Sequence, residues 1–277
     1  MLAAIPTGRI DPFSAESLAL ARQRFAREFI ACGQDPADAA ALADWLAGIC
    51  RDRGAAGFDA LGTRLAQTGI RQQWNARLDH ARAEALADWI APQLAGGVLD
   101  LLGGSGAIAA ALARRGCAPV LAVERRQHMG AFAAFPRTPF EQFLKSARPA
   151  MADSVLLCTV LHHEADPVAL LARAASLARR RIVIVENCID ADHPRDYQEF
   201  VDLFFNFCLN RTGLPAGSQH RAADGWCRLG AAWGDARLID CRDDIPGIPL
   251  SHALITIDLD RAPMPRAGNC PPARIAR

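Results

Sequence analysis

The sequence lacks several patterns by which function is commonly recognised. Its nine cysteines are dispersed without a C-x-x-C pair, and its seven histidines form neither H-x-x-x-H nor H-E-x-x-H. Such spacings bind metals in many proteins, so we expect no metal site. An odd, dispersed set of cysteines is typical of reduced thiols, which favours a cytoplasmic location.

The sequence also lacks the signature of a membrane or nucleic-acid partner. No apolar run approaches the length of about eighteen residues that a membrane span needs, and the first residues do not resemble a secretory signal. The formal net charge is only +1, and Lys and Arg form no long stripe. Because nucleic-acid binding requires clustered cations that neutralise phosphates, we expect neither partner.

The spacing of apolar residues along the sequence changes near Gly97. Helical patterns fill residues 14 to about 92, and no strand pattern precedes Gly97. Short apolar runs typical of buried strands then alternate with alanine-rich helical stretches, which predicts a parallel sheet. Strands are expected at 97–102, 119–124, weakly at 135–144, 154–160 and 182–188, and helices at 106–115, 126–134, 165–180, 195–210 and 221–234. Two last strands, 236–242 and 252–259, are linked too closely for a crossover helix and should be antiparallel.

The segment 97–107 is the most informative one. An apolar strand ends in Asp100, and a glycine cluster with Gly104 and Gly106 then opens a helix. Glycines let a ligand approach the backbone closely, and a helix N-terminus favours negative charge. Glu124 ends the next apolar run, where a carboxylate can accept hydrogen bonds from ribose hydroxyls. Together these residues predict a cofactor that contains a nucleoside.

The identity of that cofactor depends on Asp100. Gly104, Gly106 and Ala109 fit the dinucleotide fingerprint, so NAD is one reading and a purely structural glycine turn is another. A dinucleotide fold usually carries an apolar residue where this chain has Asp100. A carboxylate there suits the ammonium group of S-adenosylmethionine (SAM), which is therefore the favoured cofactor.

A second informative segment, 153–163, is a buried strand that ends in His162 and His163. Open α/β sheets hold their ligands at the carboxyl ends of their strands. A histidine there can act as a general base, because its ordinary pKa lies near neutrality. The alternative for each histidine is a structural role at the start of the next helix, and this is the preferred reading for His163.

These motifs resemble those of class I SAM-dependent methyltransferases, and among them the caffeate-type small-molecule O-methyltransferases. The family's glycine motif is D-x-G-x-G-x-G, which Asp100, Gly104 and Gly106 match, while Leu102 replaces the first glycine. By this resemblance Glu124 binds the ribose.

The resemblance also implies catalytic residues. His162 falls on the family's general base, although His163 and Glu164 replace the Asp and Trp that follow it there. Glu186, at the end of the next strand, falls on the carboxylate that orients this base; its alternative is a bond to a nearby helix start. His220 replaces a second glutamate of the family's acceptor site, which keeps a changed or lost reaction open.

Further contacts are implied less directly. The resemblance assigns cofactor contacts to Glu141, Phe143 and Cys158, and substrate contacts to Trp74, Asn75, Phe204 and Phe205. Aromatic residues at helical spacing are more often core than substrate wall, so both readings stay open.

The resemblance covers residues 71–260 and implies a Rossmann-like α/β domain. Its sheet would be seven-stranded and mostly parallel, with an antiparallel C-terminal strand. Residues 1–70 are expected to form a helical cap or dimerisation segment, with a homodimer as one assembly, and 261–277 a loose tail.

The implied activity is SAM-dependent methyl transfer to a small-molecule acceptor, most simply a hydroxyl. Three alternatives remain: C- or N-methylation, another SAM reaction such as intramolecular attack on SAM, and SAM binding without catalysis.

Overall fold

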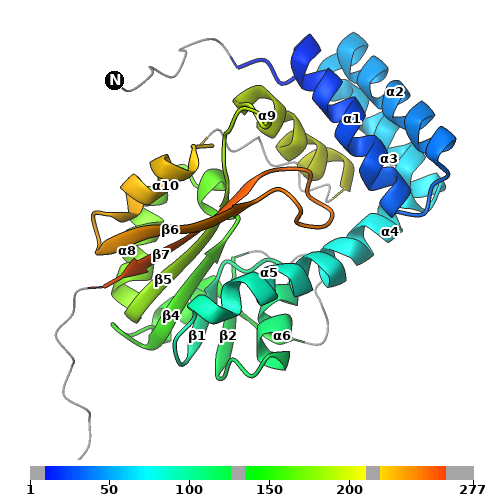
Figure 1. Ribbon diagram of the computed structural model, residues 1–277. Coiled ribbons are helices and arrows are strands. Elements are labelled where there is room, and N and C mark those ends of the chain that lie inside the picture. Colours follow the sequence, from blue (N-terminus) through cyan, green and yellow to red (C-terminus); the bar gives the residue numbers. More distant parts are fainter. Residues whose placement is uncertain (1–9, 126–134, 210–218, 260–277) are drawn as a thin grey trace, which may run out of the picture.

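The computed structural model describes residues 10–125, 135–209 and 219–259. Within them a seven-stranded sheet has the order β3-β2-β1-β4-β5-β7-β6 (Figure 1). The strands are β1 (Val98–Leu101), β2 (Val120–Glu124), β3 (Arg137–Pro139), β4 (Ala152–Cys158), β5 (Ala178–Asn187), β6 (Asp235–Arg242) and β7 (His252–Asp258). The first five strands pair in parallel, and β7 runs antiparallel to both β5 and β6. The predicted fold class is thus confirmed.

The apolar runs of the central strands are continuous because both faces of the sheet are covered. Val155 and Leu157 of β4 pack into one core together with α8 (Pro167–Leu177), α10 (Ala223–Gly230) and Phe143 of α7 (Phe140–Ser146). Leu156 and Cys158 point to the other face, where α5 (Ala83–Ile90) and α6 (Ala107–Arg114) form a second core. Successive side chains of β4 therefore pack alternately against two layers of helices, one on each face of the sheet.

The start of β5 differs from the prediction. A helix was expected to reach residue 180, but α8 ends at Leu177 and β5 begins at Ala178. Arg179 and Arg180 are exposed there, so the first residues of the strand show no apolar run. The helix predicted at 126–134 and the tail from residue 261 lie outside the described residues.

The N-terminal part is helical throughout its described length, with α1 (Ala15–Ala31), α2 (Pro36–Arg53), α3 (Gly57–Gln67) and α4 (Ile70–Arg77). Ser14 and Asp35 cap α1 and α2 by accepting hydrogen bonds from the N–H groups of Ser17 and Ala37. A π-helical turn at Leu78–Arg82 joins α4 to α5. Figure 1 shows this long helix linking the N-terminal helices to the sheet.

An aromatic core connects the N-terminal helices to α9 (Arg195–Phe204), which continues as a π turn, Phe205–Leu209. The rings of Phe25 and Phe204 lie 4.6 Å apart edge to face, and those of Trp74 and Phe204 lie 5.3 Å apart. Phe25, Trp74 and Phe204 are all fully buried. The N-terminal helices and α9, which are far apart in the sequence, therefore share one core, and α9 lies beside α1 (Figure 1).

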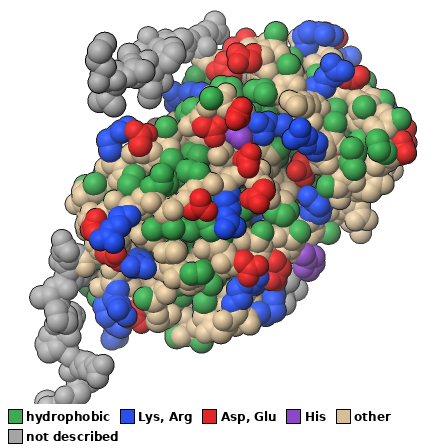
Figure 2. All heavy atoms as spheres, in the orientation of Figure 1, with side chains coloured by type: hydrophobic (Ala, Val, Ile, Leu, Met, Phe, Trp, Pro, Cys, Tyr) green, Lys and Arg blue, Asp and Glu red, His purple; other side chains and the backbone are tan. Residues whose placement is uncertain are grey.

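Two features of the surface complete the fold. On the face in Figure 2, acidic and basic side chains are interspersed rather than gathered by sign. Among the described residues, no helix combines the length and the apolar character needed to cross a membrane.

We predict that Phe25→Ala lowers the free energy of unfolding by about 3–5 kcal/mol, because it opens a cavity among packed rings. The matched control on the same helix is Ile30→Ala, since Ile30 is 45% exposed; its effect should stay within about 0.5 kcal/mol. Urea unfolding measures both. A loss below about 1 kcal/mol for Phe25→Ala would contradict a core shared by α1 and α9.

Candidate active site

The turn after β1 places a leucine in a backbone conformation that glycine adopts more easily. Leu102 has φ 63°, Gly104 φ 61° and Gly106 φ 82°. Leucine in this left-handed region costs about 1–2 kcal/mol. The cost is offset where the Leu102 N–H donates to the carbonyl of Val123 at 2.8 Å and the side chain packs into the core. Leu102 therefore adopts a left-handed conformation at the position of the motif's first glycine.

Asp100 lies directly beneath this turn. Its side chain is fully buried, and neither carboxylate oxygen has a hydrogen-bond partner among the described residues. A Cβ atom at Gly103 would collide with this carboxylate, so the turn passes as close over it as glycine allows. Burial and the neighbouring charge of Glu124 raise the pKa of Asp100 to about 7.

The turn is held from two sides. The N–H of Gly104 donates to Oε2 of Glu124 at 2.8 Å, and Arg137 donates to the carbonyl of Gly104 at 2.7 Å. These contacts bring the carboxyl ends of β1 and β2 together with β3. Glu124 is thus adjacent to the glycine turn, as its predicted role requires, and that role stays a prediction.

A second group of side chains lies at the carboxyl ends of β4 and β5. Glu186 is fully buried and accepts hydrogen bonds from the N–H groups of Val160 at 2.7 Å and Leu161 at 2.6 Å. Its other oxygen lies 2.6 Å from Nδ1 of His162. Glu186 therefore stabilises the turn Leu161–His163 and orients the ring, so both sequence readings of this residue describe real contacts.

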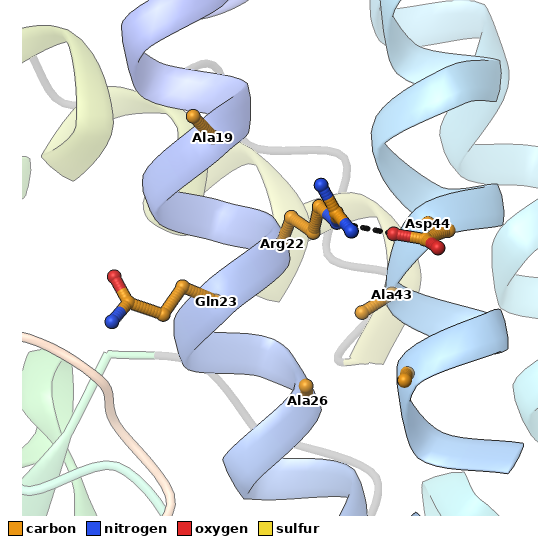
Figure 3. Close-up of a pocket in the computed structure, with 7 residues that line it drawn as sticks. Ala19, Arg22, Gln23, Ala26, Ala43 and Asp44 are labelled. Carbon is orange, nitrogen blue, oxygen red and sulfur yellow. Dashed lines mark ion pairs between the residues drawn. The ribbon is translucent and has the colours of Figure 1, made fainter. Parts of the chain in front are cut away.

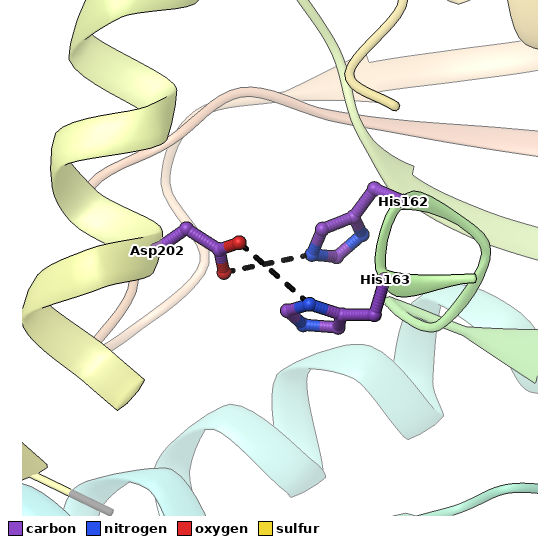
Figure 4. Close-up of side chains that lie close together, drawn as sticks. All are labelled: His162, His163 and Asp202. Carbon is purple, nitrogen blue, oxygen red and sulfur yellow. Dashed lines mark ion pairs between the residues drawn. The ribbon is translucent and has the colours of Figure 1, made fainter. Parts of the chain in front are cut away.

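The other nitrogen of His162 faces a residue that the sequence did not single out. Nε2 lies 3.8 Å from Oδ1 of Asp202, and Nδ1 of His163 lies 3.6 Å from Oδ2 of the same carboxylate (Figure 4). The ring of His220 stacks on that of His162 at 5.1 Å. Oε2 of Glu199 lies 3.7 Å from Nε2 of His220.

The charges of this group influence one another strongly. Burial lowers the pKa of His162, but the charges and hydrogen bonds of Glu186 and Asp202 raise it to about 10 overall. Burial raises the pKa of Asp202, but His162 and the other histidines lower it to about 2. Burial and the charge of His162 lower the pKa of His220 to about 3. The two carboxylates thus favour the protonated form of His162, and burial favours the neutral form of His220.

The remaining predicted site residues are spread over the fold. Cys158 is buried at the end of β4 and electrostatically coupled to Asp100 and Glu186. On α7, Glu141 is exposed and Phe143 is buried in the core.

The predicted substrate residues belong to the aromatic core or its edge. Trp74 and Phe204 are fully buried, and the indole of Trp74 donates to the carbonyl of Gly247 at 2.8 Å. Asn75 and Phe205 are half-buried. The structure places Trp74 and Phe204 as the core reading describes, and no contact here tests a substrate role.

A pocket elsewhere in the described residues lies between α1 and α2 (Figure 3). Its lining is mostly alanine, with an exposed ion pair between Arg22 and Asp44. None of the residues discussed above lines it, and we assign it no chemistry.

Comparisons with known proteins give likeness in fold. No protein-family model matches the sequence, and no curated protein matches it either. A protein from Nostoc punctiforme PCC 73102 assigned as an O-methyltransferase is 14% identical with a TM-score of 0.46, covering 68% of this chain and 60% of its own. This chain thus spans less than two thirds of that protein's length.

Two further solved structures are similar. A mitomycin 7-O-methyltransferase is 19% identical with a TM-score of 0.45, and the match covers 88% of this chain and 76% of the other. A Burkholderia thailandensis 1,6-didemethyltoxoflavin-N1-methyltransferase, solved with that substrate and S-adenosylhomocysteine, is 17% identical with a TM-score of 0.46, covering 72% of this chain and 88% of the other. Likeness at this level concerns the fold alone.

We predict that Asp100→Asn stabilises the chain at pH 8, by roughly 2–4 kcal/mol. Asp100 has a pKa of about 7 when folded, against an ordinary value of 3.8. The folded state therefore binds this proton more tightly than the unfolded chain, and the cost of the buried charge is full above pH 7.

That cost fades as the pH falls from 7 towards 3.8, so the advantage of Asp100→Asn should vanish over the same interval. Urea unfolding at several pH values measures it, with the exposed residue Asp52 as control through Asp52→Asn. A stability difference independent of pH would contradict an ionised, unpaired Asp100.

Proposed function

We propose that the chain binds SAM at the carboxyl ends of β1 and β2 and transfers its methyl group to a small-molecule acceptor. The observation that carries the proposal is Asp100, a buried carboxylate without a hydrogen-bond partner beneath the glycine turn. A buried anion needs a cationic or hydrogen-bonding ligand. The ammonium group of SAM is such a ligand.

The same observation disfavours a dinucleotide. Glu124 lies close enough to Asp100 to raise its pKa, so two carboxylates flank the turn. A pyrophosphate would add further negative charge beside them, and like charges in a buried site repel strongly. A cationic cofactor has the opposite effect and supports SAM over NAD.

The other cofactor contacts follow from this placement. Gly104 and Gly106 leave the backbone open to the ligand, and Glu124 would receive the ribose hydroxyls. Cys158 would lie beside the cofactor's amino-acid part, near Asp100. The adenine would lie towards α7, where Glu141 is exposed and Phe143 anchors the helix in the core.

When bound, SAM supplies a methyl group already activated by its positively charged sulfur. The chain's own task is then to place the acceptor in line and to remove its proton. We propose a hydroxyl acceptor and His162 as the base, because Glu186 holds Nδ1 and leaves Nε2 facing Asp202. His220 would form a second wall through its stacked ring.

A base role for His162 requires that its ring be neutral when the acceptor binds. Glu186 and Asp202 both favour the protonated ring, and a protonated ring cannot accept a proton. The acceptor oxygen must therefore take the place of the Asp202 carboxylate at Nε2. If the ring instead keeps its proton, the same site suits an acceptor that needs no base, such as an amine or an already ionised carbon, which is the second candidate function.

We expect SAM and S-adenosylhomocysteine to bind the chain, and NAD and NADP not to bind, in calorimetric titrations. Asp100→Asn should weaken SAM binding by roughly 10- to 100-fold, because a charged hydrogen bond to the ammonium is lost. Asp153→Asn is the matched control, since Asp153 lies near the amino end of β4, whereas the proposed SAM site lies at the carboxyl ends of the strands. Binding of NAD without SAM would overturn the proposal.

His162→Ala should lower methyl transfer by about 10²–10⁴-fold, the range of general-base contributions, while SAM affinity changes little. Transfer of a labelled methyl group from SAM to a panel of phenols and alcohols measures the rate. His80→Ala, at an exposed position, is the control. An unchanged rate for His162→Ala would exclude the base role and leave the base-free reaction.

A further inference from the structure

Three side chains at the carboxyl end of β4 converge on one point. His162 and His163 follow β4, and Asp202 projects from α9 towards both rings (Figure 4). One ligating atom from each residue lies within 4.8 Å of the others. The sequence did not predict this group, because its carboxylate, Asp202, lies on a helix that is distant in the sequence from the two histidines.

The distances within the group suit a shared ion. The Asp202 oxygens lie 3.8 Å from Nε2 of His162 and 3.6 Å from Nδ1 of His163. Two ligands bound tetrahedrally to one Zn²⁺ at about 2.1 Å each lie about 3.4 Å apart. Small side-chain rotations would bring each pair to this separation.

Glu186 supplies an independent second observation. A histidine that binds a metal usually donates its other N–H to a carboxylate, which fixes the ring and directs the ligating nitrogen. Here Glu186 lies 2.6 Å from Nδ1 of His162 and is itself fixed by two backbone N–H groups. The nitrogen left over, Nε2, is the one that faces Asp202.

Two neighbouring groups extend the polar environment. His220 is buried, and neither of its ring nitrogens has a hydrogen-bond partner among the described residues. Oε2 of Glu199 faces it at 3.7 Å, also without a hydrogen bond. These groups offer further ligands or hydrogen bonds for what binds beside the three side chains.

We propose that His162, His163 and Asp202 form a binding site for one divalent transition-metal ion. Two imidazole nitrogens and one carboxylate suit Zn²⁺, Mn²⁺, Fe²⁺ or Co²⁺, whereas Mg²⁺ and Ca²⁺ prefer oxygen ligands throughout. Three protein ligands leave one position open in a four-coordinate site and two in a five-coordinate one, as in sites that bind substrate.

The site itself does not depend on SAM; its part in methyl transfer rests on the function proposed above. A cation held by Nε2 of His162 would take the place of that nitrogen as the base. It would instead bind an acceptor oxygen directly and lower the pKa of the hydroxyl, which would release its proton to water. The acceptor class would then be a hydroxyl with a second oxygen nearby, such as a catechol or a hydroxy-ketone, which can hold the ion with both atoms.

The test is a titration of the chelator-treated full chain with Zn²⁺ against a chromophoric chelator, in the absence of SAM. We expect one ion per chain, bound at least 10-fold more weakly by His163→Ala and by Asp202→Asn. His80→Ala is the control and should bind as the unaltered chain does. Co²⁺ provides a spectroscopic readout, since its visible absorption reports ligand geometry.

His163→Ala is the decisive variant, because its side chain is 32% exposed and the change should not disturb folding. Equal Zn²⁺ affinity for His163→Ala and the unaltered chain would mean an adventitious ion only and would overturn the site, as would no binding at all. SAM titration of the same metal-free samples keeps the two proposals apart: SAM binding without Zn²⁺ binding removes only the metal site, and the reverse removes only the SAM proposal.

Discussion

One buried carboxylate, that of Glu186, determines the geometry of the candidate site at the carboxyl ends of β4 and β5. It accepts hydrogen bonds from Val160 and Leu161 and holds Nδ1 of His162. An ionised carboxylate has several acceptor positions, and three donors satisfy most of them. Since the N–H groups fix the turn after β4 and the ring fixes Nε2, the direction in which His162 meets a ligand follows from this residue on the neighbouring strand.

The carboxyl edge of the sheet thus holds two kinds of buried carboxylate. Glu186 and Asp202 both face His162, and both raise its pKa. Asp100 has no such partner, and its pKa is raised rather than lowered. A paired carboxylate organises the protein around it, whereas an unpaired one costs stability unless a ligand balances it. This difference separates the two halves of the edge: one carboxylate orients the chain's own side chains, and Asp100 has no hydrogen-bond partner among the described residues.

The sequence predicted the residues that belong to a local pattern, and it did not predict those whose position depends on packing. Asp100, Glu124 and Glu186 lie at or next to the last residue of an apolar strand, and His162 lies in the turn that follows β4. An apolar run that stops at a polar residue is a local pattern, which the sequence shows directly. Asp202 and Glu199 lie on a helix whose orientation the sequence cannot give, so neither was recognised. The aromatic rings of α9 were ambiguous for the same reason, because helical spacing does not distinguish a core from a ligand wall.

The N-terminal helices act on the site through α9. Phe200, Val201 and Phe204 occupy one side of α9 and are buried in the aromatic core with α1, while Asp202 projects from another side to His162 and His163. A helix fixed on one face presents its opposite residues at a set depth and angle. Packing of Phe25 against Phe204 therefore fixes the helix that carries Asp202, so the N-terminal helices and the candidate site are joined through α9.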